Sequence, residues 1–191
     1  MLKRLKYYDH ELSIRWALCG RPSSPYLYLR KLIMILEFSG SGYVWIPYVI
    51  IMIGVHYTSM ESVIPYVLFS CGLLVDIALV GTAKATFRRQ RPVINRDDVL
   101  SIGPDKFSFP SGHTSRAVFL LFYFVHVSFF PSIPVSVITI WLSAVIASRI
   151  LLGRHYISDL FAGFIFGVVE FFITIQISPI ISQLVVAYYQ K

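Results

Sequence analysis

Residues 63–83 read VIPYVLFSCGLLVDIALVGTA, an apolar stretch with one charged residue, Asp76. About 20 apolar residues are needed to cross the hydrocarbon core of a bilayer, and about 17 is the lower limit. This stretch passes that limit, and four further apolar stretches lie close to it, at residues 42–57, 114–130, 133–148 and 160–177. Backbone groups in lipid must satisfy one another within their segment, so such stretches form helices. We predict an all-α integral membrane bundle with four to five transmembrane helices.

The composition of the 191-residue chain excludes an ordinary soluble domain. Hydrophobic residues make up 56% of it and charged residues 14%, whereas a typical soluble domain has about 25% charged residues. Residues 42–191 are predicted to be the membrane-embedded domain. Residues 1–41 are more basic, and their short apolar runs, 9–18 and 27–38, contain charges such as Glu37. We expect amphipathic interfacial helices there, although ordinary membrane packing explains these runs equally well.

The net charge of +7 indicates a membrane orientation rather than a nucleic-acid partner. Lys and Arg gather in residues 1–31, 84–116 and 149–154, which share one membrane face if the helices alternate. The opposite turns, 56–62 and 129–134, contain no Lys or Arg. Basic loops stay on the cytosolic side of a membrane. We therefore expect the basic face to lie on the cytosolic side. We expect membrane lipids as partners, and we expect no nucleic-acid partner.

The first of three polar elements is KATFRRQRP, residues 84–92. Lys84 and Arg91 are seven residues apart and share a helical face if the preceding helix continues to Pro92, which then ends it. An ammonium and a planar guanidinium together grip phosphate oxygens well. A basic cluster at a membrane surface also contacts lipid head groups, so this element alone leaves both interpretations open.

The second element is SFPSGHTSRAV, residues 108–118, where Ser111 and Gly112 precede an apolar helix. The first N–H groups of a helix have no partner within the helix and carry partial positive charge, so an anion can bind there. Gly112 lets backbone approach a ligand closely, and His113 stands beside it. An ordinary helix start with a serine cap and an interfacial histidine is the alternative.

The third element is SRILLGRHYISD, residues 148–159. His155 and Asp159 are four residues apart, so on a helix their side chains meet. A carboxylate on one ring nitrogen fixes the tautomer and leaves the other nitrogen free as a base or nucleophile. The alternative is a structural pair that caps a helix.

Taken together, the three elements resemble the signature of the type 2 phosphatidic acid phosphatase superfamily. That signature is Lys, six residues, Arg-Pro; then Pro-Ser-Gly-His; then Ser-Arg, five residues, His, three residues, Asp. Every specified position is present here at the family's spacing: Lys84, Arg91, Pro92, Pro110, Ser111, Gly112, His113, Ser148, Arg149, His155 and Asp159.

The resemblance implies a role for each matched residue. His155 would attack phosphorus and form a phosphohistidine, oriented by Asp159, while His113 protonates the leaving oxygen. The phosphoryl oxygens would be held by Lys84, Arg91, Arg149, Ser111 and the Gly112 N–H. These roles fit phosphoryl transfer, which needs positioning, charge neutralisation and an in-line attacker.

No metal or other cofactor is predicted. Two-metal phosphatases need clustered carboxylates, and the loop between the first two elements contains only Asp97, Asp98 and Asp105. A cysteine phosphatase is excluded because neither Cys19 nor Cys71 has Arg six positions later. The expected reaction is therefore metal-independent.

The blocks RRQRPVINRDD, DKFSFPSGHTSRA and SRILLGRHYISD resemble the small members of the family that act on polyisoprenoid diphosphates, including presqualene diphosphate. This resemblance implies a lipid diphosphate substrate such as presqualene, farnesyl or geranylgeranyl diphosphate. It also implies a location in the endoplasmic reticulum or nuclear envelope. A phosphatidate or sphingoid-phosphate phosphatase and a catalytically silent scaffold of the same fold are the alternatives. No oligomeric state is predicted.

Overall fold

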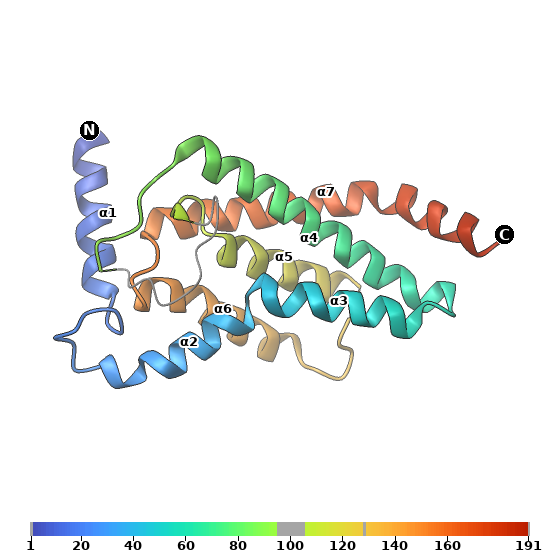
Figure 1. Cartoon of the computed structure of the whole chain (residues 1–191), viewed down its shortest axis with the longest axis horizontal. Coiled ribbons are helices and arrows are strands. Elements are labelled where there is room, and N and C mark those ends of the chain that lie inside the picture. Colours follow the sequence, from blue (N-terminus) through green and yellow to red (C-terminus); the bar gives the residue numbers. More distant parts are fainter. Residues whose placement is uncertain (1, 95–105, 128, 191) are drawn as a thin grey trace.

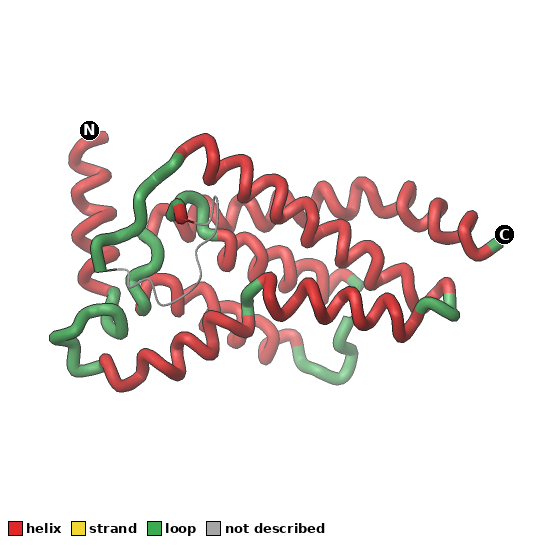
Figure 2. The backbone as a smooth tube through the Cα atoms, viewed as in Figure 1, coloured by secondary structure: helices red, strands yellow, loops and turns green. Residues whose placement is uncertain are grey.

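The structure, a computed structural model, describes residues 2–94, 106–127 and 129–190. These residues form helices and connections and contain no strand (Figure 1, Figure 2), which confirms the all-α prediction. The helices are α1 (Leu2–Trp16), the short 3₁₀ helix η1 (Leu27–Leu29), α2 (Arg30–Ser39), α3 (Gly42–His56), α4 (Met60–Phe87), α5 (Gly112–His126), α6 (Val135–Leu151) and α7 (Ile157–Tyr189).

The long apolar helices make this an integral membrane protein. Among the described residues, three segments are long and apolar enough to cross a membrane: Leu27–His56, α4 and α7, while α6 is apolar but shorter. The predicted four to five crossings therefore stay a prediction. With 33 residues, α7 is about 50 Å long at about 1.5 Å per residue. It exceeds a bilayer core of about 30 Å, so it must tilt or extend beyond the core.

The polar connections gather at one end of the bundle. The C-terminal ends of α4 and α6 and the N-terminal ends of α5 and α7 lie there beside α1, whereas the C-terminus of the chain lies at the far end (Figure 1). The helices pack mainly as α5 and α4 on α7, α3 on α4 and α6 on α5. This arrangement brings the three motif segments of the sequence to one end of the molecule.

Aromatic side chains fill the interior between α3, α4 and α5. Phe69 stacks on Phe119 and Tyr123, with ring centroids 6.1 and 5.5 Å apart, and meets Trp45 edge to face at 5.9 Å. Phe69 and Phe119 are fully buried. Aromatic pairs of this kind add about 0.5–1.5 kcal/mol to the burial of their surface. They hold α4 and α5, and with them Lys84 and His113, in fixed relation.

Two glycines on α7 allow α5 to approach closely. A Cβ at Gly163 would lie 2.6 Å from the Ser111 carbonyl oxygen and 2.9 Å from Thr114 Cβ, and one at Gly167 would meet the Ser115 carbonyl oxygen. Because backbone cannot give way as a flexible side chain can, these positions fix the spacing between the two helices. The start of α5 consequently sits directly against the first turns of α7.

Replacing Gly163 with alanine is expected to lower the free energy of unfolding by about 1–3 kcal/mol, since the added methyl forces α5 and α7 apart. The matched control is Gly81→Ala on α4, where an added Cβ meets nothing within 4 Å. That change should be neutral or stabilising, because alanine is the better helix former by up to about 1 kcal/mol. Thermal unfolding of the detergent-solubilised variants measures the difference; equal midpoints would contradict the close approach.

The segment at residues 27–38 contributes to the interior as well as to the surface. Helix α2 packs on α6, and two of its three charged residues, Arg30 and Glu37, are 8% and 5% exposed, while Lys31 is exposed. Arg30 donates through NH1 to the Cys19 carbonyl oxygen at 2.8 Å. Interfacial placement of residues 1–41 stays a prediction, but Glu37 faces protein.

Candidate active site

Helix α4 places Lys84 at the site and then stops. Lys84 is 3% exposed, and its Nζ donates to the Phe107 carbonyl oxygen at 2.9 Å. The helix ends at Phe87 because Arg88 takes the left-handed conformation, with φ 47°. The condition under which Lys84 and Arg91 would share a helical face is therefore not met. Arg91 instead comes from the extended segment after α4, where its NH1 donates to the Arg154 carbonyl oxygen at 3.4 Å.

The start of α5 has a serine cap, the feature that belonged to the alternative interpretation of this segment. Ser111 Oγ accepts from the Thr114 N–H at 3.4 Å and from Thr114 Oγ1 at 3.0 Å. The Ser111 N–H donates to the Asp159 carbonyl oxygen at 3.1 Å, which ties the start of α5 to the first turn of α7. Gly112 and His113 follow in the first turn, whose N–H groups are suited to an anion.

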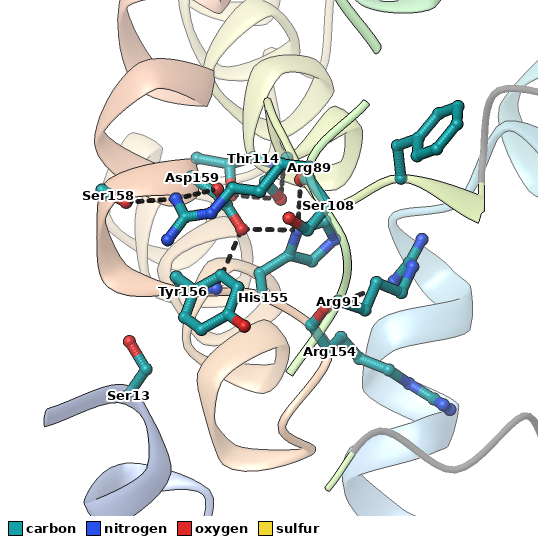
Figure 3. Close-up of polar contacts among 12 residues, drawn as sticks. Ser13, Arg89, Arg91, Ser108, Thr114, Arg154, His155, Tyr156, Ser158 and Asp159 are labelled. Atoms are coloured by element: carbon teal, nitrogen blue, oxygen red, sulfur yellow. Dashed lines mark hydrogen bonds and ion pairs between the residues drawn. The ribbon is translucent and has the colours of Figure 1, made fainter. Parts of the chain in front are cut away.

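His155 lies in the connection between α6 and α7, two residues before α7 begins, and is 2% exposed. Its Nδ1 lies 2.7 Å from the Ser108 carbonyl oxygen. A carbonyl oxygen only accepts, so Nδ1 must carry the hydrogen. The neutral ring consequently presents Nε2 with a free lone pair, the form that a nucleophile requires. Figure 3 shows His155 beside Ser108 and Asp159.

Four basic side chains surround His155. Burial first, and then the positive charges of these groups, hold the pKa of His155 well below its usual range. The charges come from different segments of the chain: Arg149, Arg91, Lys84 and His113. The ring is therefore neutral at physiological pH, and the same charges favour an anion placed among them.

Asp159 does more than face His155. Its Oδ2 lies 3.5 Å from His155 Nδ1, longer than the bond from that nitrogen to Ser108, and accepts from the Tyr156 N–H at 2.9 Å. Its Oδ1 accepts from Arg89 at 2.8 Å. The carboxylate thus caps α7 and pairs with Arg89 while it lies beside the imidazole. The sequence left two interpretations open, a carboxylate beside the imidazole and a structural pair that caps a helix, and the geometry contains elements of both.

Arg149 is held by an acid that the motifs do not contain. It lies in the last turn of α6, is 3% exposed and forms an ion pair with Glu37 of α2. Glu37 Oε1 also lies 3.3 Å from Arg154 Nε. Glu37 therefore neutralises charge on the α6 side of the site.

A second buried polar cluster lies deeper in the bundle. Asp76 of α4 forms an ion pair with Arg116 of α5, and Ser115 donates to Glu170 of α7 at 3.1 Å. Asp76 and Glu170 are 1% and 0% exposed. Charged residues within a membrane usually face a partner inside the bundle, and here that partner is Arg116.

A cavity of about 530 Å³ lies between α3, α4 and α5. Lys84, Gly112 and His113 line its polar end, and Arg116 and Asp76 lie further along it. Its apolar wall is formed by Tyr43, Ile46, Pro47, Ile77 and Val80. The cavity therefore joins three of the predicted site residues, Lys84, Gly112 and His113, to apolar side chains that are partly exposed on the outer face of the bundle, among them Tyr43 and Ile77.

Sequence reasoning missed three contributors to this site: Ser108, Arg89 and Glu37. Arg89 stands inside the quoted KATFRRQRP block, and the only signal for Glu37 was an acid in an apolar run. The loop acids Asp97, Asp98 and Asp105 lie outside the described residues, so metal independence stays a prediction. Cys19 and Cys71 are free thiols.

The fold and the site define an integral membrane helical protein whose buried neutral histidine faces a group of cations. The PAP2 superfamily model matches residues 65–181, more than half of the chain and all three polar elements. The chain belongs to the PAP2 superfamily.

Relatives and solved structures agree with this membership. Probable lipid phosphate phosphatase beta of Arabidopsis thaliana is 34% identical over 131 residues, which cover 53% of this chain and 60% of that protein. The chain thus spans only about three fifths of that relative's length. The fold is similar to a transmembrane PAP2 type phosphatidylglycerolphosphate phosphatase from Bacillus subtilis, with TM-score 0.66, 21% identity and coverage of 92% and 87% of the two chains. Aquifex aeolicus LpxE gives TM-score 0.60, 25% identity and coverage of 87% and 93%.

Proposed function

We propose that this protein hydrolyses phosphate from lipid phosphates or diphosphates, without a metal or other cofactor, through a phosphohistidine on His155. One observation carries the proposal: a buried, neutral imidazole whose Nδ1 is engaged by the Ser108 carbonyl, among the charges of Lys84, Arg91 and Arg149. Such a ring has one nucleophilic nitrogen, and the cations attract the group that it would attack.

The reaction has two balanced steps. His155 Nε2 attacks phosphorus, and the nitrogen–phosphorus bond forms as the bond to the leaving oxygen breaks. That oxygen keeps the electron pair and takes a proton from His113. Water then attacks phosphorus and passes a proton to His113, and the nitrogen–phosphorus bond breaks. Inorganic phosphate leaves, and both histidines return to their starting states.

The remaining site residues hold the phosphoryl oxygens. Lys84 and Arg91 approach from the segment around the end of α4, and Arg149 approaches from α6, so charge is neutralised from two sides. Ser111 and the Gly112 N–H lie at the N-terminus of α5, where unpaired backbone donors favour an anion. Positioning and electrostatic stabilisation of this kind supply most of the acceleration in phosphoryl transfer.

The proposed substrates are polyisoprenoid diphosphates such as presqualene, farnesyl or geranylgeranyl diphosphate. The cavity beside Lys84 and His113 supports a long apolar chain, because apolar side chains from α3 and α4 line it. A second candidate class, phosphatidate or sphingoid phosphates, is favoured by the name of the Arabidopsis relative, a probable lipid phosphate phosphatase.

Phosphate release by the purified, detergent-solubilised protein tests both classes. Farnesyl diphosphate, presqualene diphosphate, phosphatidate and sphingosine phosphate are compared in the presence of a chelator. We expect release that the chelator does not reduce, with the diphosphates as the better substrates. Higher activity on phosphatidate would favour the second class, and no release from any of the four would indicate a catalytically silent scaffold.

The site is proposed to face the cytosol from the endoplasmic reticulum or nuclear envelope, because the basic connections lie at the same end of the bundle as the site. The turn after α3 then faces the lumen. The orientation can be tested in sealed vesicles with Thr58→Cys, made in a variant in which Cys19 and Cys71 have both been replaced so that position 58 holds the single cysteine. Protection from an impermeant thiol reagent is expected, and labelling from the cytosolic side would reverse the orientation.

A further inference from the structure

The first turn of α7 is capped by a helix from the other end of the sequence. Asp9 of α1 accepts from the Ser158 N–H at 3.0 Å and from Ser158 Oγ at 2.6 Å. Ser13 Oγ, one turn further along α1, accepts from the Ile157 N–H at 2.9 Å. These N–H groups have no partner within α7, so α1 supplies the partners that fix where α7 begins.

Arg89 links this cap to the proposed catalytic pair. Its NH2 donates to Asp9 at 2.7 Å, and its NH1 donates to Asp159 at 2.8 Å and to Ser158 Oγ at 2.6 Å. The guanidinium carbon lies 3.9 Å from the centre of the Tyr156 ring. Figure 3 shows Arg89 alongside Ser158 and Asp159, with the Asp159 carboxylate in turn reaching toward His155.

We propose that Arg89 and Asp9 are positioning residues for the reaction: Asp9 on α1 orients Arg89, and Arg89 orients and partly neutralises Asp159 beside His155. The inference rests on the proposed role of His155. Neither residue occupies a signature position. The side chain of Arg89 reaches His155 through Asp159, and the Arg89 carbonyl oxygen accepts from the N–H of Ser108, whose own carbonyl oxygen meets His155 Nδ1. The N-terminal helix would then control the alignment of the nucleophile in addition to any contact it makes with lipid.

Charge gives this arrangement a consequence that packing alone does not predict. The charged groups that face His155 are, by element, Lys84 of α4, Arg91 of the following segment, His113 of α5, Arg149 of α6 and Asp159 of α7. Burial raises the pKa of Asp159, and the charge of Arg89 opposes that rise. Removing Arg89 takes one positive charge away from the Asp159–His155 pair, which raises the pKa of His155. Removing the charge of Asp9 leaves Arg89 to act on Asp159 alone, which lowers the pKa of His155.

Burial acts to raise the pKa of Asp9, but the hydrogen bonds from Arg89 and Ser158 outweigh burial, and its pKa lies below the usual range. Asp9 is therefore ionised wherever the enzyme is expected to work. Asp9→Asn therefore removes one negative charge at every pH of the assay.

The test uses the full chain in detergent with farnesyl diphosphate, and compares Asp9→Asn, Arg89→Gln and Arg89→Lys. For Arg89→Gln we expect kcat to fall about 10–100-fold with KM nearly unchanged, the size of effect seen when a residue that orients a metal-ligating side chain is replaced. Arg89→Lys should recover most of the loss. The acid limb of the kcat/KM profile should move to higher pH in Arg89→Gln and to lower pH in Asp9→Asn.

The matched controls are Arg88→Gln and Glu11→Gln. Arg88 is the exposed neighbour of Arg89 and donates through Nε to the Ala85 carbonyl oxygen at 2.9 Å; Glu11 is a partly exposed acid on α1. Both should retain wild-type kinetics. The inference would be overturned if the acid limb moved in the same direction in Arg89→Gln and Asp9→Asn. Kinetics of Arg89→Gln equal to those of Arg88→Gln would overturn it as well.

Loss of folding is separated from loss of positioning by two variants that change the structure less. Asp9→Asn still reports the shift of the acid limb, and Arg89→Lys reports the recovery of kcat. A fall in kcat that follows the unfolding midpoint, with no pH shift and no rescue by lysine, would assign the cluster a purely structural role. The proposed function fails separately, if His155→Ala keeps full activity.

Discussion

Replacing His155 with alanine is expected to reduce phosphate release by about 10⁴-fold or more, because loss of a nucleophile removes the covalent route altogether. The imidazole is buried and its Nδ1 is engaged by Ser108, so no other described side chain stands where Nε2 does. Labelled substrate quenched at alkaline pH should leave acid-labile phosphate on the wild-type chain and none on the variant.

The control for that measurement is His126→Ala. His126 lies at the C-terminal end of α5, packed edge to face against Phe171 with ring centroids 5.6 Å apart, far along the helix from His113. It should retain wild-type activity. Phosphorylated protein that persists in His155→Ala would move the nucleophile elsewhere, to His113 in the first instance.

The long apolar helices could be predicted from the sequence because their apolar length indicates them, whereas α1, which is polar on average, was expected only as a short run at 9–18. The apolar stretch at 63–83 became α4, Met60–Phe87, and the stretch at 42–57 became α3, Gly42–His56. The ends differ where local chemistry decides: Ser59 caps the start of α4, and the left-handed Arg88 ends it. The pattern of apolar residues contains neither piece of information.

The motif residues could be predicted as a group because each sits next to a helix end. His155 and Asp159 were expected to meet on one helix, and they do lie 3.5 Å apart, although His155 precedes α7. Lys84 and His113 come together because α4 and α5 share an aromatic interior.

The partners of the motif residues could not be predicted. Asp9 and Arg89 are 80 positions apart, and nothing in their local sequence indicates that they pair. The Ser108 carbonyl acts through the main chain, so the identity of its side chain carries no signal. Contacts of this kind follow from the docking of α1 on α7, which depends on the whole fold.

Replacing Glu37 with glutamine is expected to lower the free energy of unfolding by about 3–5 kcal/mol, as for other buried ion pairs that lose one partner. Glu37 pairs with Arg149, and its two oxygens lie 3.3 and 3.5 Å from Arg154. Both arginines are 3% exposed. Glutamine keeps the shape but leaves two buried guanidinium groups without the carboxylate that they share.

Glu61→Gln is the control, because Glu61 is an exposed acid in the first turn of α4, at the far end of the bundle. Its effect should stay within about 0.5 kcal/mol. Inorganic phosphate should raise the unfolding midpoint of Glu37→Gln more than that of the wild type, since an anion bound at Arg149 replaces the missing charge. Equal midpoints for the two variants would contradict a shared carboxylate. If phosphate stabilises the variant no more than the wild type, Arg149 does not bind the phosphate. The proposed reaction requires that it does, with the same guanidinium that pairs with Glu37.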